Sequence, residues 1–450
     1  MTEEARSSLA LAVGLLLDEG PRALWNRTQD RLEENKRLRR LPRLREDRGR
    51  LSIDVEPAPV LNVSPLPPSP KRGGAQIQML DRLAEEKKLR TVALAYPKDG
   101  SWWLEISGTS VAGIFAIGGE ALVADLIQRA ANLIGSSVVH IESLAGLPLN
   151  LVGDLEDRNL SVVLSIHDFT LFCRRPHLTE SATGKFCEYC QDFDRCDACL
   201  QNVDPKLNTT QAEYRRMGAG AYKKATLVIF PSDFLQRQHR VLFPGLRGPG
   251  RDAVIAPASS RPGSSISSSP VPSRIAFVGG VYSHKGAALI GPVMERLQSL
   301  VPDVVGFVYG NGERKLLRQL RRTKGIRIRG YYRQGELPVM LKRDRVSVAV
   351  LPSIWPEAYA LVVDECLSAG VPVIAFDIGA VGDRLVDWGV GHLVPMHLGA
   401  GGLAGAFVGH LSSGLEVPGE IIASLPRPEG AARRYVELYG GLETGDRCFE

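Results

Sequence analysis

The sequence contains no long hydrophobic run. A membrane-spanning helix needs about 20 consecutive apolar residues, and the longest N-terminal candidate, Leu9–Leu17, is much shorter. This run also follows acidic residues, whereas a secretory signal begins with a basic segment. We therefore expect neither a transmembrane helix nor a secretory signal, and a cytoplasmic location is the default.

The chain also has few cysteines and a small net charge. The chain has 7 cysteines in 450 residues, and most of them lie within Cys173–Cys199, which is not the distribution of a disulfide framework. The net charge of +5 is small for this length and does not indicate nucleic-acid binding. The hydrophobic content of 44% and charged content of 23% are ordinary, and the length allows two domains.

Short apolar runs alternate with helical stretches along most of the chain, which favours parallel α/β sheets. The basic N-terminal arm, residues 1–58, is expected either to pack on the first α/β domain, residues 59–256, or to contact anionic lipid at the inner face of the membrane. The predicted parts are a helical arm over 1–58, an α/β domain over 59–256, a Ser- and Pro-rich linker over 257–274, a second α/β domain over 275–430 and a tail helix over 431–450.

The segment Pro352–Ala375 is the most informative stretch. It predicts a loop, a helix entered near Pro356, a helix stop at Gly370 and a buried strand. Glu357 stands at the edge of the loop and Glu365 inside the helix. The free N–H groups of a first helical turn bind anions, here with a carboxylate on either side. This pattern suits a ligand that combines phosphates with hydroxyl groups, such as a sugar nucleotide.

This segment resembles the donor-binding motif of retaining glycosyltransferases of family 4 (glycosyl transferases group 1). The family pattern appears here as Pro352-Ser353, Glu357, Glu365 and Ala369–Val373, and the resemblance extends over about residues 60–440. It implies the GT-B fold, in which two Rossmann-like domains face a central cleft. It also implies transfer of a sugar from a nucleoside diphosphate sugar to an acceptor, with retention of configuration and no metal required for catalysis.

A second segment, Phe277–Gly286, resembles the family loop that neutralises the donor diphosphate. Lys285 occupies the lysine position of that loop, but Gly280 occupies the position of the usual arginine. His284 or a basic residue from elsewhere would have to substitute for it. This departure leaves open an alternative, a catalytically weakened sugar-nucleotide-binding or scaffold protein of the same fold.

The resemblance assigns further roles, several of them at strand ends, where ligands collect in open α/β sheets. It implies a catalytic group, a set of additional donor contacts and an acceptor side. The catalytic group is His167, Glu357 and Lys285; the donor contacts are Glu365, Gly280, Gly310, Gly330, Tyr331, Ala360 and Leu361; the acceptor-side residues are Gly73, Gly74 and Asp168.

Four of the clustered cysteines form two CxxC pairs, Cys187 with Cys190 and Cys196 with Cys199. This spacing suits a structural zinc site, while reduced thiols and an iron–sulfur cluster are the alternatives. Acidic neighbours of the cluster would repel phosphate, which argues against a nucleic-acid partner. The sequence does not identify the sugar, the base or the acceptor, which could be a glycan, a lipid-linked glycan, a protein or a natural product.

Overall fold

The computed structural model of the chain describes residues 41–51, 59–69, 73–108, 112–258 and 268–444. Most of the predicted arm and half of the predicted linker lie outside these residues. The predicted contact of the arm with lipid therefore also concerns residues outside the described ranges. No helix within these ranges is long and apolar enough to cross a membrane. The chain divides into two compact units, an N-terminal unit that includes the last helix and a C-terminal unit over 268–425.

The N-terminal unit is built on an eight-stranded sheet with the order β10-β9-β8-β7-β3-β4-β5-β6. The pairs from β10 to β4 are parallel, and β4, β5 and β6 pair in antiparallel fashion. The strands are β3 (Leu61–Val63), β4 (Val92–Lys98), β5 (Ser101–Ser107), β6 (Ala112–Gly118), β7 (Val138–Ile141), β8 (Ser161–Ser165), β9 (Leu227–Phe230) and β10 (Asp252–Val254). A separate small hairpin pairs β1 (Glu46–Asp47) with β2 (Arg50–Leu51).

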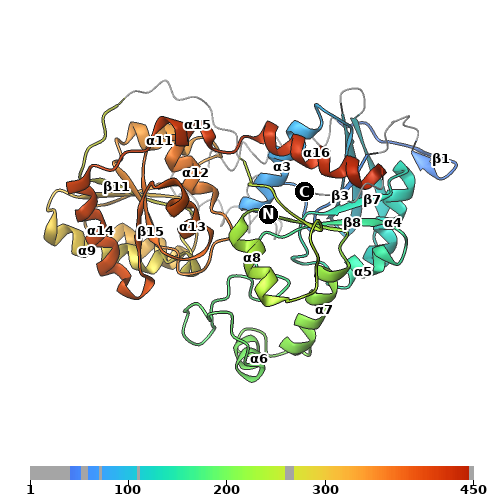
Figure 1. Cartoon of the computed structure of the whole chain (residues 1–450), viewed down its shortest axis with the longest axis horizontal. Coiled ribbons are helices and arrows are strands. Elements are labelled where there is room, and N and C mark those ends of the chain that lie inside the picture. The colour runs from blue at the N-terminus through green and yellow to red at the C-terminus, as the bar shows by residue number, and fades with distance from the viewer. Residues whose placement is uncertain (1–40, 52–58, 70–72, 109–111, 259–267, 445–450) are drawn as a thin grey trace, which may run out of the picture. The chain divides into compact units, whose positions relative to one another are not determined.

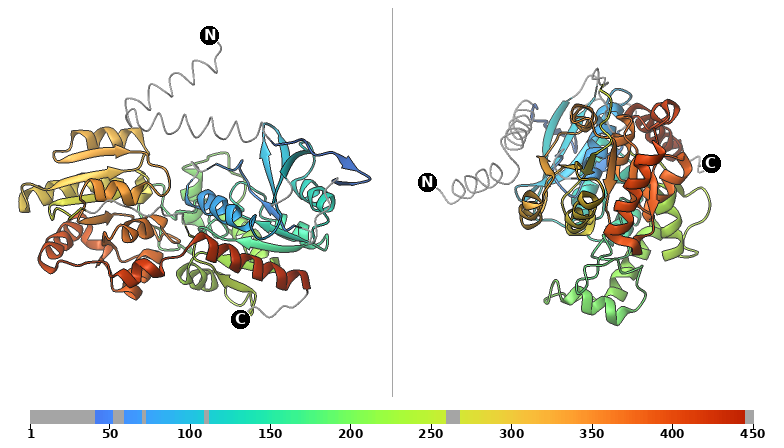
Figure 2. Two further views of the ribbon diagram at one scale, coloured as in Figure 1. Left: turned by 90° about the horizontal axis from the view of Figure 1, so that it is seen from above. Right: turned by 90° about the vertical axis from the view of Figure 1, so that its left-hand side faces the viewer.

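Helices cover this sheet, as Figure 1 shows. They are α3 (Gly74–Glu86), α4 (Val123–Ile134), α5 (Leu151–Glu156), α7 (Gln211–Lys224), α8 (Asp233–Leu242) and α16 (Pro428–Thr444). The helix α6 (Phe193–Gln201) lies apart from the sheet in Figure 1. The helix α16, formed by the end of the chain, lies beside α3 in Figures 1 and 2. Its residues Tyr435, Leu438 and Tyr439 pack against apolar side chains of the sheet.

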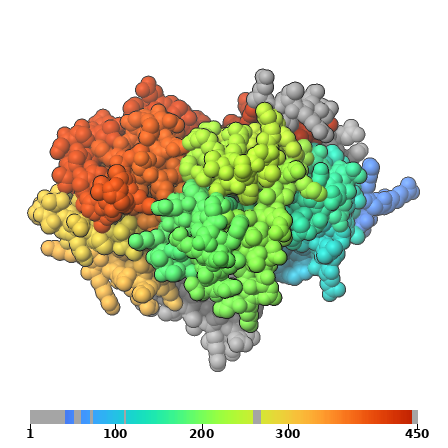
Figure 3. Space-filling model, turned by 60° about the horizontal axis from the view of Figure 1, so that its bottom comes forward, coloured from blue at the N-terminus to red at the C-terminus, as the bar shows by residue number. Residues whose placement is uncertain are grey.

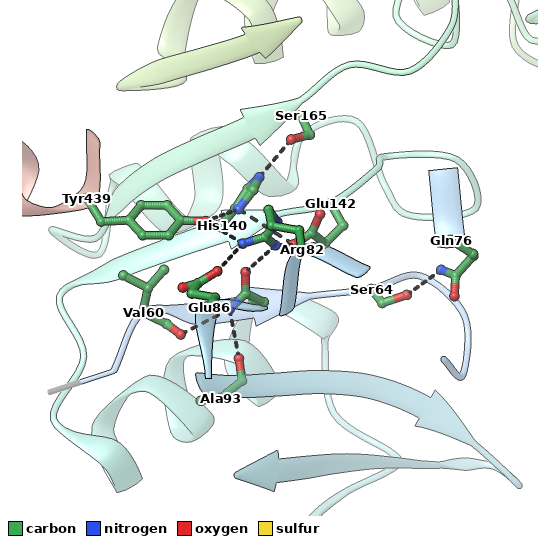
Figure 4. A network of polar contacts seen from close by, with 11 residues as sticks. Val60, Ser64, Gln76, Arg82, Glu86, Ala93, His140, Glu142, Ser165 and Tyr439 are labelled. Carbon is green, nitrogen blue, oxygen red and sulfur yellow. Dashed lines mark hydrogen bonds and ion pairs between the residues drawn. The ribbon is translucent and has the colours of Figure 1, made fainter. Parts of the chain in front are cut away.

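A buried polar network joins α16 to the rest of the N-terminal unit (Figure 4). Arg82 on α3 forms ion pairs with Glu86 and Glu142, and it donates a hydrogen bond to the Tyr439 hydroxyl at 3.1 Å. The same hydroxyl lies 2.6 Å from Nδ1 of His140. All five side chains are buried, so their polar atoms depend on one another in place of water.

The C-terminal unit is built on a six-stranded, all-parallel sheet with the order β13-β12-β11-β14-β15-β16. This is the 3-2-1-4-5-6 order of the Rossmann fold. The strands are β11 (Arg274–Val278), β12 (Val305–Tyr309), β13 (Ile326–Gly330), β14 (Val348–Leu351), β15 (Val373–Phe376) and β16 (His392–Val394). The predicted α/β class with parallel sheets is confirmed.

Side chains of alternate residues fill the cores on the two faces of this sheet. Ile275, Phe277 and Ile374 belong to one core, whereas Ala276 and Ala375 belong to the other. The helices are α9 (Ile290–Leu300), α10 (Arg314–Arg322), α11 (Leu337–Arg343), α12 (Leu361–Ser368), α13 (Gly379–Trp388), α14 (Gly399–Ser413) and α15 (Gly419–Ser424), with short 3-10 helices η1 (Ser283–Lys285), η2 (Ala287–Leu289) and η3 (Met396–Leu398).

Candidate functional site

The predicted donor residues gather at the carboxyl ends of the strands of the C-terminal unit, where open α/β sheets bind their ligands. The loops that follow neighbouring strands are joined through their backbones. Gly279 N–H donates to the carbonyl of Tyr309 at 3.0 Å, and Gly310 N–H donates to the carbonyl of Gly330 at 2.8 Å. A Cβ atom at Gly310 would lie 2.8 Å from the carbonyl carbon of Gly279, so this close approach requires glycine.

Lys285 and Glu357 form an ion pair between the loops that follow β11 and β14. The Lys285 Nζ donates to the two carboxylate oxygens of Glu357 at 2.8 and 2.9 Å, and Ser353 Oγ donates to Oε1 at 3.0 Å. Burial alone would raise the pKa of Glu357, but Lys285 and Ser353 hold this pKa below its usual value. The Glu357 carboxylate is therefore charged at neutral pH.

Gly286 holds Lys285 in this position. Its φ of 68° is left-handed, and a Cβ atom there would lie 2.7 Å from the carbonyl carbon of Pro352 and closer still to its oxygen. The loop that carries Lys285 thus rests directly on the end of β14. Any side chain at position 286 would push the two loops apart.

Substitution Gly286→Ala is expected to lower the free energy of unfolding by about 2–4 kcal/mol, because it adds a backbone clash to the cost of a left-handed alanine. Gly370→Ala is the matched control, since Gly370 has φ of 74° but nothing within 4 Å of its Cβ position. The control should lose only about 1–2 kcal/mol. Urea unfolding of the two variants measures the difference, and equal losses would contradict the role assigned to the Pro352 contact.

The loop between β14 and α12 positions the first amides of α12. Ala360 precedes the helix with φ of 64°, and α12 begins at Leu361. The predicted helix entry at Pro356 is therefore wrong, because the left-handed Ala360 ends the loop only after Glu357. Alanine has no side-chain oxygen with which to cap the first-turn N–H groups. One of these groups, Val363 N–H, donates to the Ala360 carbonyl at 3.0 Å. The predicted helix stop at Gly370, with φ of 74°, is confirmed.

A buried group behind this loop fixes its conformation. Asp364 accepts a hydrogen bond from the Tyr359 hydroxyl at 2.9 Å and forms an ion pair with Arg384. Arg384 also donates to the Tyr359 carbonyl at 2.7 Å and lies 3.7 Å from the centre of the Tyr359 ring. A Cβ atom at Gly379 would lie 2.7 Å from the Glu357 nitrogen. The sequence does not reveal these contacts, since Gly379 and Arg384 lie on α13 and have no recognisable spacing from Tyr359 and Asp364.

Glu365 lies on α12 and is only 4% exposed. Its Oε1 accepts a hydrogen bond from Gly335 N–H at 3.4 Å in the loop after β13. Tyr332 lies against it, and burial, followed by the charge of Glu365, raises the pKa of this tyrosine well above its usual value. Gly330, with φ of 72°, ends β13 and turns the chain into Tyr331. The structure thus brings the predicted Gly330–Tyr331 turn close to Glu365.

The predicted catalytic residue His167 and the predicted acceptor-side residues belong to the N-terminal unit. His167 and Asp168 follow β8, and burial lowers the pKa of His167 to about 4, so its imidazole is neutral. Among the described residues its buried Nε2 atom has no hydrogen-bond partner. Asp168 accepts a hydrogen bond from Thr170 N–H at 2.8 Å, which makes it a turn-capping residue. Gly73, with φ of 86°, leads into α3, which begins at Gly74.

The cysteine-rich segment between β8 and α7 extends away from the sheet of its unit in Figure 2, and its surface is drawn in green in Figure 3. Its four CxxC thiols make local contacts. Cys199 Sγ accepts from Ser181 N–H at 3.2 Å, and Cys196 Sγ lies 3.6 Å from an Arg215 nitrogen and 3.7 Å from the Cys190 carbonyl oxygen.

These contacts do not support the predicted zinc site. Among the described residues no group of three or more His, Cys, Asp or Glu side chains is placed to hold a metal ion. The guanidinium of Arg215 lies beside Cys196. Burial raises the pKa of the Cys196 thiol to about 12 in the metal-free protein. The pairs Cys187–Cys190 and Cys196–Cys199 are free thiols.

Part of the C-terminal unit is similar in sequence to known proteins. Residues 268–405 match the family model described as Glycosyl transferases group 1. A phosphatidyl-myo-inositol mannosyltransferase from Mycolicibacterium smegmatis is 28% identical over 127 residues. That match covers 28% of this chain and spans only 33% of the relative's own length.

Solved structures resemble nearly the whole chain. Sucrose-phosphate synthase from Thermosynechococcus elongatus has a TM-score of 0.58 and 15% identity, over 86% of this chain and 100% of that one. Anabaena HepE in complex with UDP has a TM-score of 0.55 and 14% identity, over 85% of this chain and 100% of that one. At this identity the likeness concerns the fold, and it confirms the predicted GT-B class of two Rossmann-like domains. Fold and matched domain together support a GT-B glycosyltransferase.

Proposed function

We propose that the protein is a retaining glycosyltransferase of family 4, which transfers a sugar from a nucleoside diphosphate sugar to a glycan, a lipid-linked glycan, a protein or a natural product. The observation that carries the proposal is the ion pair of Lys285 and Glu357, held beside the uncapped start of α12. Both residues lie within the matched range 268–405. The same chemistry suits UDP, which is bound in the HepE structure.

Lys285 and the first amides of α12, from Leu361 onward, stabilise the charge that develops on the leaving diphosphate. Preorganised donors of this kind act mainly on the transition state, because they need no reorganisation when the bond breaks. Glu357 keeps the Lys285 ammonium in place before the donor arrives and then faces the donor sugar. In this scheme the positive charge comes from groups of the protein, and no bound metal is needed for catalysis.

Glu365 binds the ribose hydroxyls of the donor, and Tyr331 lies beside the base. The neutral imidazole of His167 offers an unpartnered Nε2 atom to a sugar hydroxyl. Gly73 and Gly74 stand at the acceptor side, where the backbone at the start of α3 can approach a ligand closely. Asp168 acts indirectly, through the turn that it caps.

Glu365→Gln is expected to weaken donor binding by about 10–100-fold, because a carboxylate hydrogen bond to a hydroxyl contributes about 1.5–3 kcal/mol. The measurement is a panel of nucleoside diphosphate sugars, followed by thermal stabilisation and donor hydrolysis. Glu295→Gln, on the exposed face of α9, is the matched control and should behave as wild type. One donor that stabilises wild type and control, but not the variant, would identify the sugar.

The alternative of a weakened sugar-nucleotide-binding or scaffold protein gives a different result in the same experiment. Stabilisation by a donor without hydrolysis or transfer would favour that alternative. Stabilisation by no donor at all would overturn the proposed function.

A further inference from the structure

The loop Gly279–Gly286 carries one permanent cation for a ligand with two anionic groups. A nucleoside diphosphate sugar has a negative charge on each phosphate, whereas Lys285 is the only Lys or Arg in the loop. Its charge is already matched by the Glu357 carboxylate at 2.8 Å. Binding a diphosphate here therefore needs a further source of positive charge.

The Tyr282 ring occupies the space that a cationic side chain at position 280 would need. A Cβ atom at Gly280 would lie 2.5 Å from Cδ2 of the Tyr282 ring, so a cationic side chain at position 280 could enter only if the ring moved. The tyrosine is 39% exposed, and its backbone carbonyl accepts hydrogen bonds from Lys285 N–H at 3.1 Å and Ala287 N–H at 3.3 Å. The ring is thus held over the glycine by the same turn that carries Lys285.

His284 lies beneath this ring. The imidazole stacks on Tyr282 with centroids 5.7 Å apart and planes at 9°, and it meets Trp355 edge-on at 6.0 Å. Aromatic rings favour a cation at such distances. The charged groups that face His284 are Lys285, Glu357 and Glu313. Without donor, burial and then Lys285 lower the pKa of His284, although both carboxylates act to raise it.

We propose that the Tyr282–His284 stack supplies the missing charge: His284 takes up a proton from solvent when the donor binds, and the imidazolium neutralises part of the diphosphate. Tyr282 acts as a positioning residue that holds the imidazole in the stack. This inference rests on the proposed function. A bound anion raises the pKa of the imidazole, so donor affinity is greatest at pH values below the pKa of the free site and is lost as pH rises through the pKa of the complex.

Calorimetric titration of the full chain with UDP-glucose and GDP-mannose, from pH 6 to 8.5 in buffers of different ionisation heat, tests the proposal. The diphosphate diester does not titrate in this range, so proton uptake reports on the protein. Wild type should take up a fraction of a proton on binding and lose affinity toward pH 8.5, by at most about 10-fold for a one-unit pKa shift. His284→Gln should bind weakly with no proton uptake, while His397→Gln, at an exposed histidine of η3, should match wild type.

A second pair of variants tests the position of Tyr282. Gly280→Arg alone should weaken binding, because the arginine displaces the ring. Gly280→Arg combined with Tyr282→Ser should bind with an affinity that no longer depends on pH. The inference is overturned if His284→Gln keeps the wild-type proton uptake, or if wild type binds donor without any. Binding of neither donor at any pH would instead overturn the proposed function.

Discussion

Lys285→Met is expected to lower kcat/KM for sugar transfer by about 10²–10³-fold, the range found when one preorganised donor to a developing negative charge is removed. The change removes the only Lys or Arg of the loop Gly279–Gly286. It also leaves the Glu357 carboxylate, whose side chain is 10% exposed, without its partner. The pKa of Glu357 should then rise, since burial is no longer opposed by the ammonium group.

Two comparisons separate this chemical loss from a loss of folding. Lys315→Met, at an exposed position on α10, should leave kcat/KM unchanged. Lys285→Arg should recover part of the rate, because it restores charge with a different geometry. Circular dichroism and the melting temperature of each variant show whether it folds. A folded Lys285→Met variant with wild-type kcat/KM would remove Lys285 from the catalytic group.

Arg82→Met is expected to destabilise the N-terminal unit by about 3–5 kcal/mol, because it removes the cation that forms ion pairs with two buried carboxylates. Glu86 and Glu142 are 1% and 5% exposed, so neither can recover solvation by a small movement. Arg129→Met is the matched control: its ion pair with Glu46 is largely exposed and should contribute less than about 1 kcal/mol. Hydrogen exchange in α3, β7 and α16 measures the loss where it occurs.

The loss of folding stability in Arg82→Met should depend on pH and should be smaller at low pH. In the folded wild type, burial already raises the pKa of Glu142 to about 7, above its ordinary value of 4.5. A carboxyl group with a raised folded pKa favours folding below its unfolded pKa, and this advantage disappears as pH rises through the folded value. Removal of Arg82 raises the folded pKa further. The deficit should therefore shrink from pH 8 to pH 5, and a deficit that grows on acidification would contradict this assignment.

The sequence predicts the local structure of the segment Pro352–Ala375 well because its signals are local. Strand ends, the Glu357–Glu365 spacing and the Gly370 stop all lie within one loop, helix and strand, and the structure reproduces that succession. The start of α12 differs, because Gly379 and the Asp364–Arg384 pair hold the loop extended past Pro356. Those contacts join separate elements, and a single sequence does not reveal such pairings.

Two further features of the N-terminal unit escape the sequence-based predictions for different reasons. The β4–β5 hairpin has a visible signal, Asp99-Gly100 with φ values of 53° and 75°, which is the two-residue turn that joins antiparallel strands. This turn signal is overlooked when strands and helices are expected to alternate along the domain. The Arg82 network has no such signal, since its members come from α3, β7 and α16, and only the folded chain brings them together.

The position of α16 has a consequence for the order in which the protein acquires its structure during synthesis. Residues 426–444, which complete the N-terminal unit, leave the ribosome after the whole of the C-terminal unit. The unit made first is therefore finished last, and until then the surface that receives Tyr435, Leu438 and Tyr439 stays uncovered. The segment 268–425, which forms most of the other unit, can fold before residues 426–444 are made. Nascent chains of this protein thus depend on residues 426–444 to cover an apolar surface and limit aggregation.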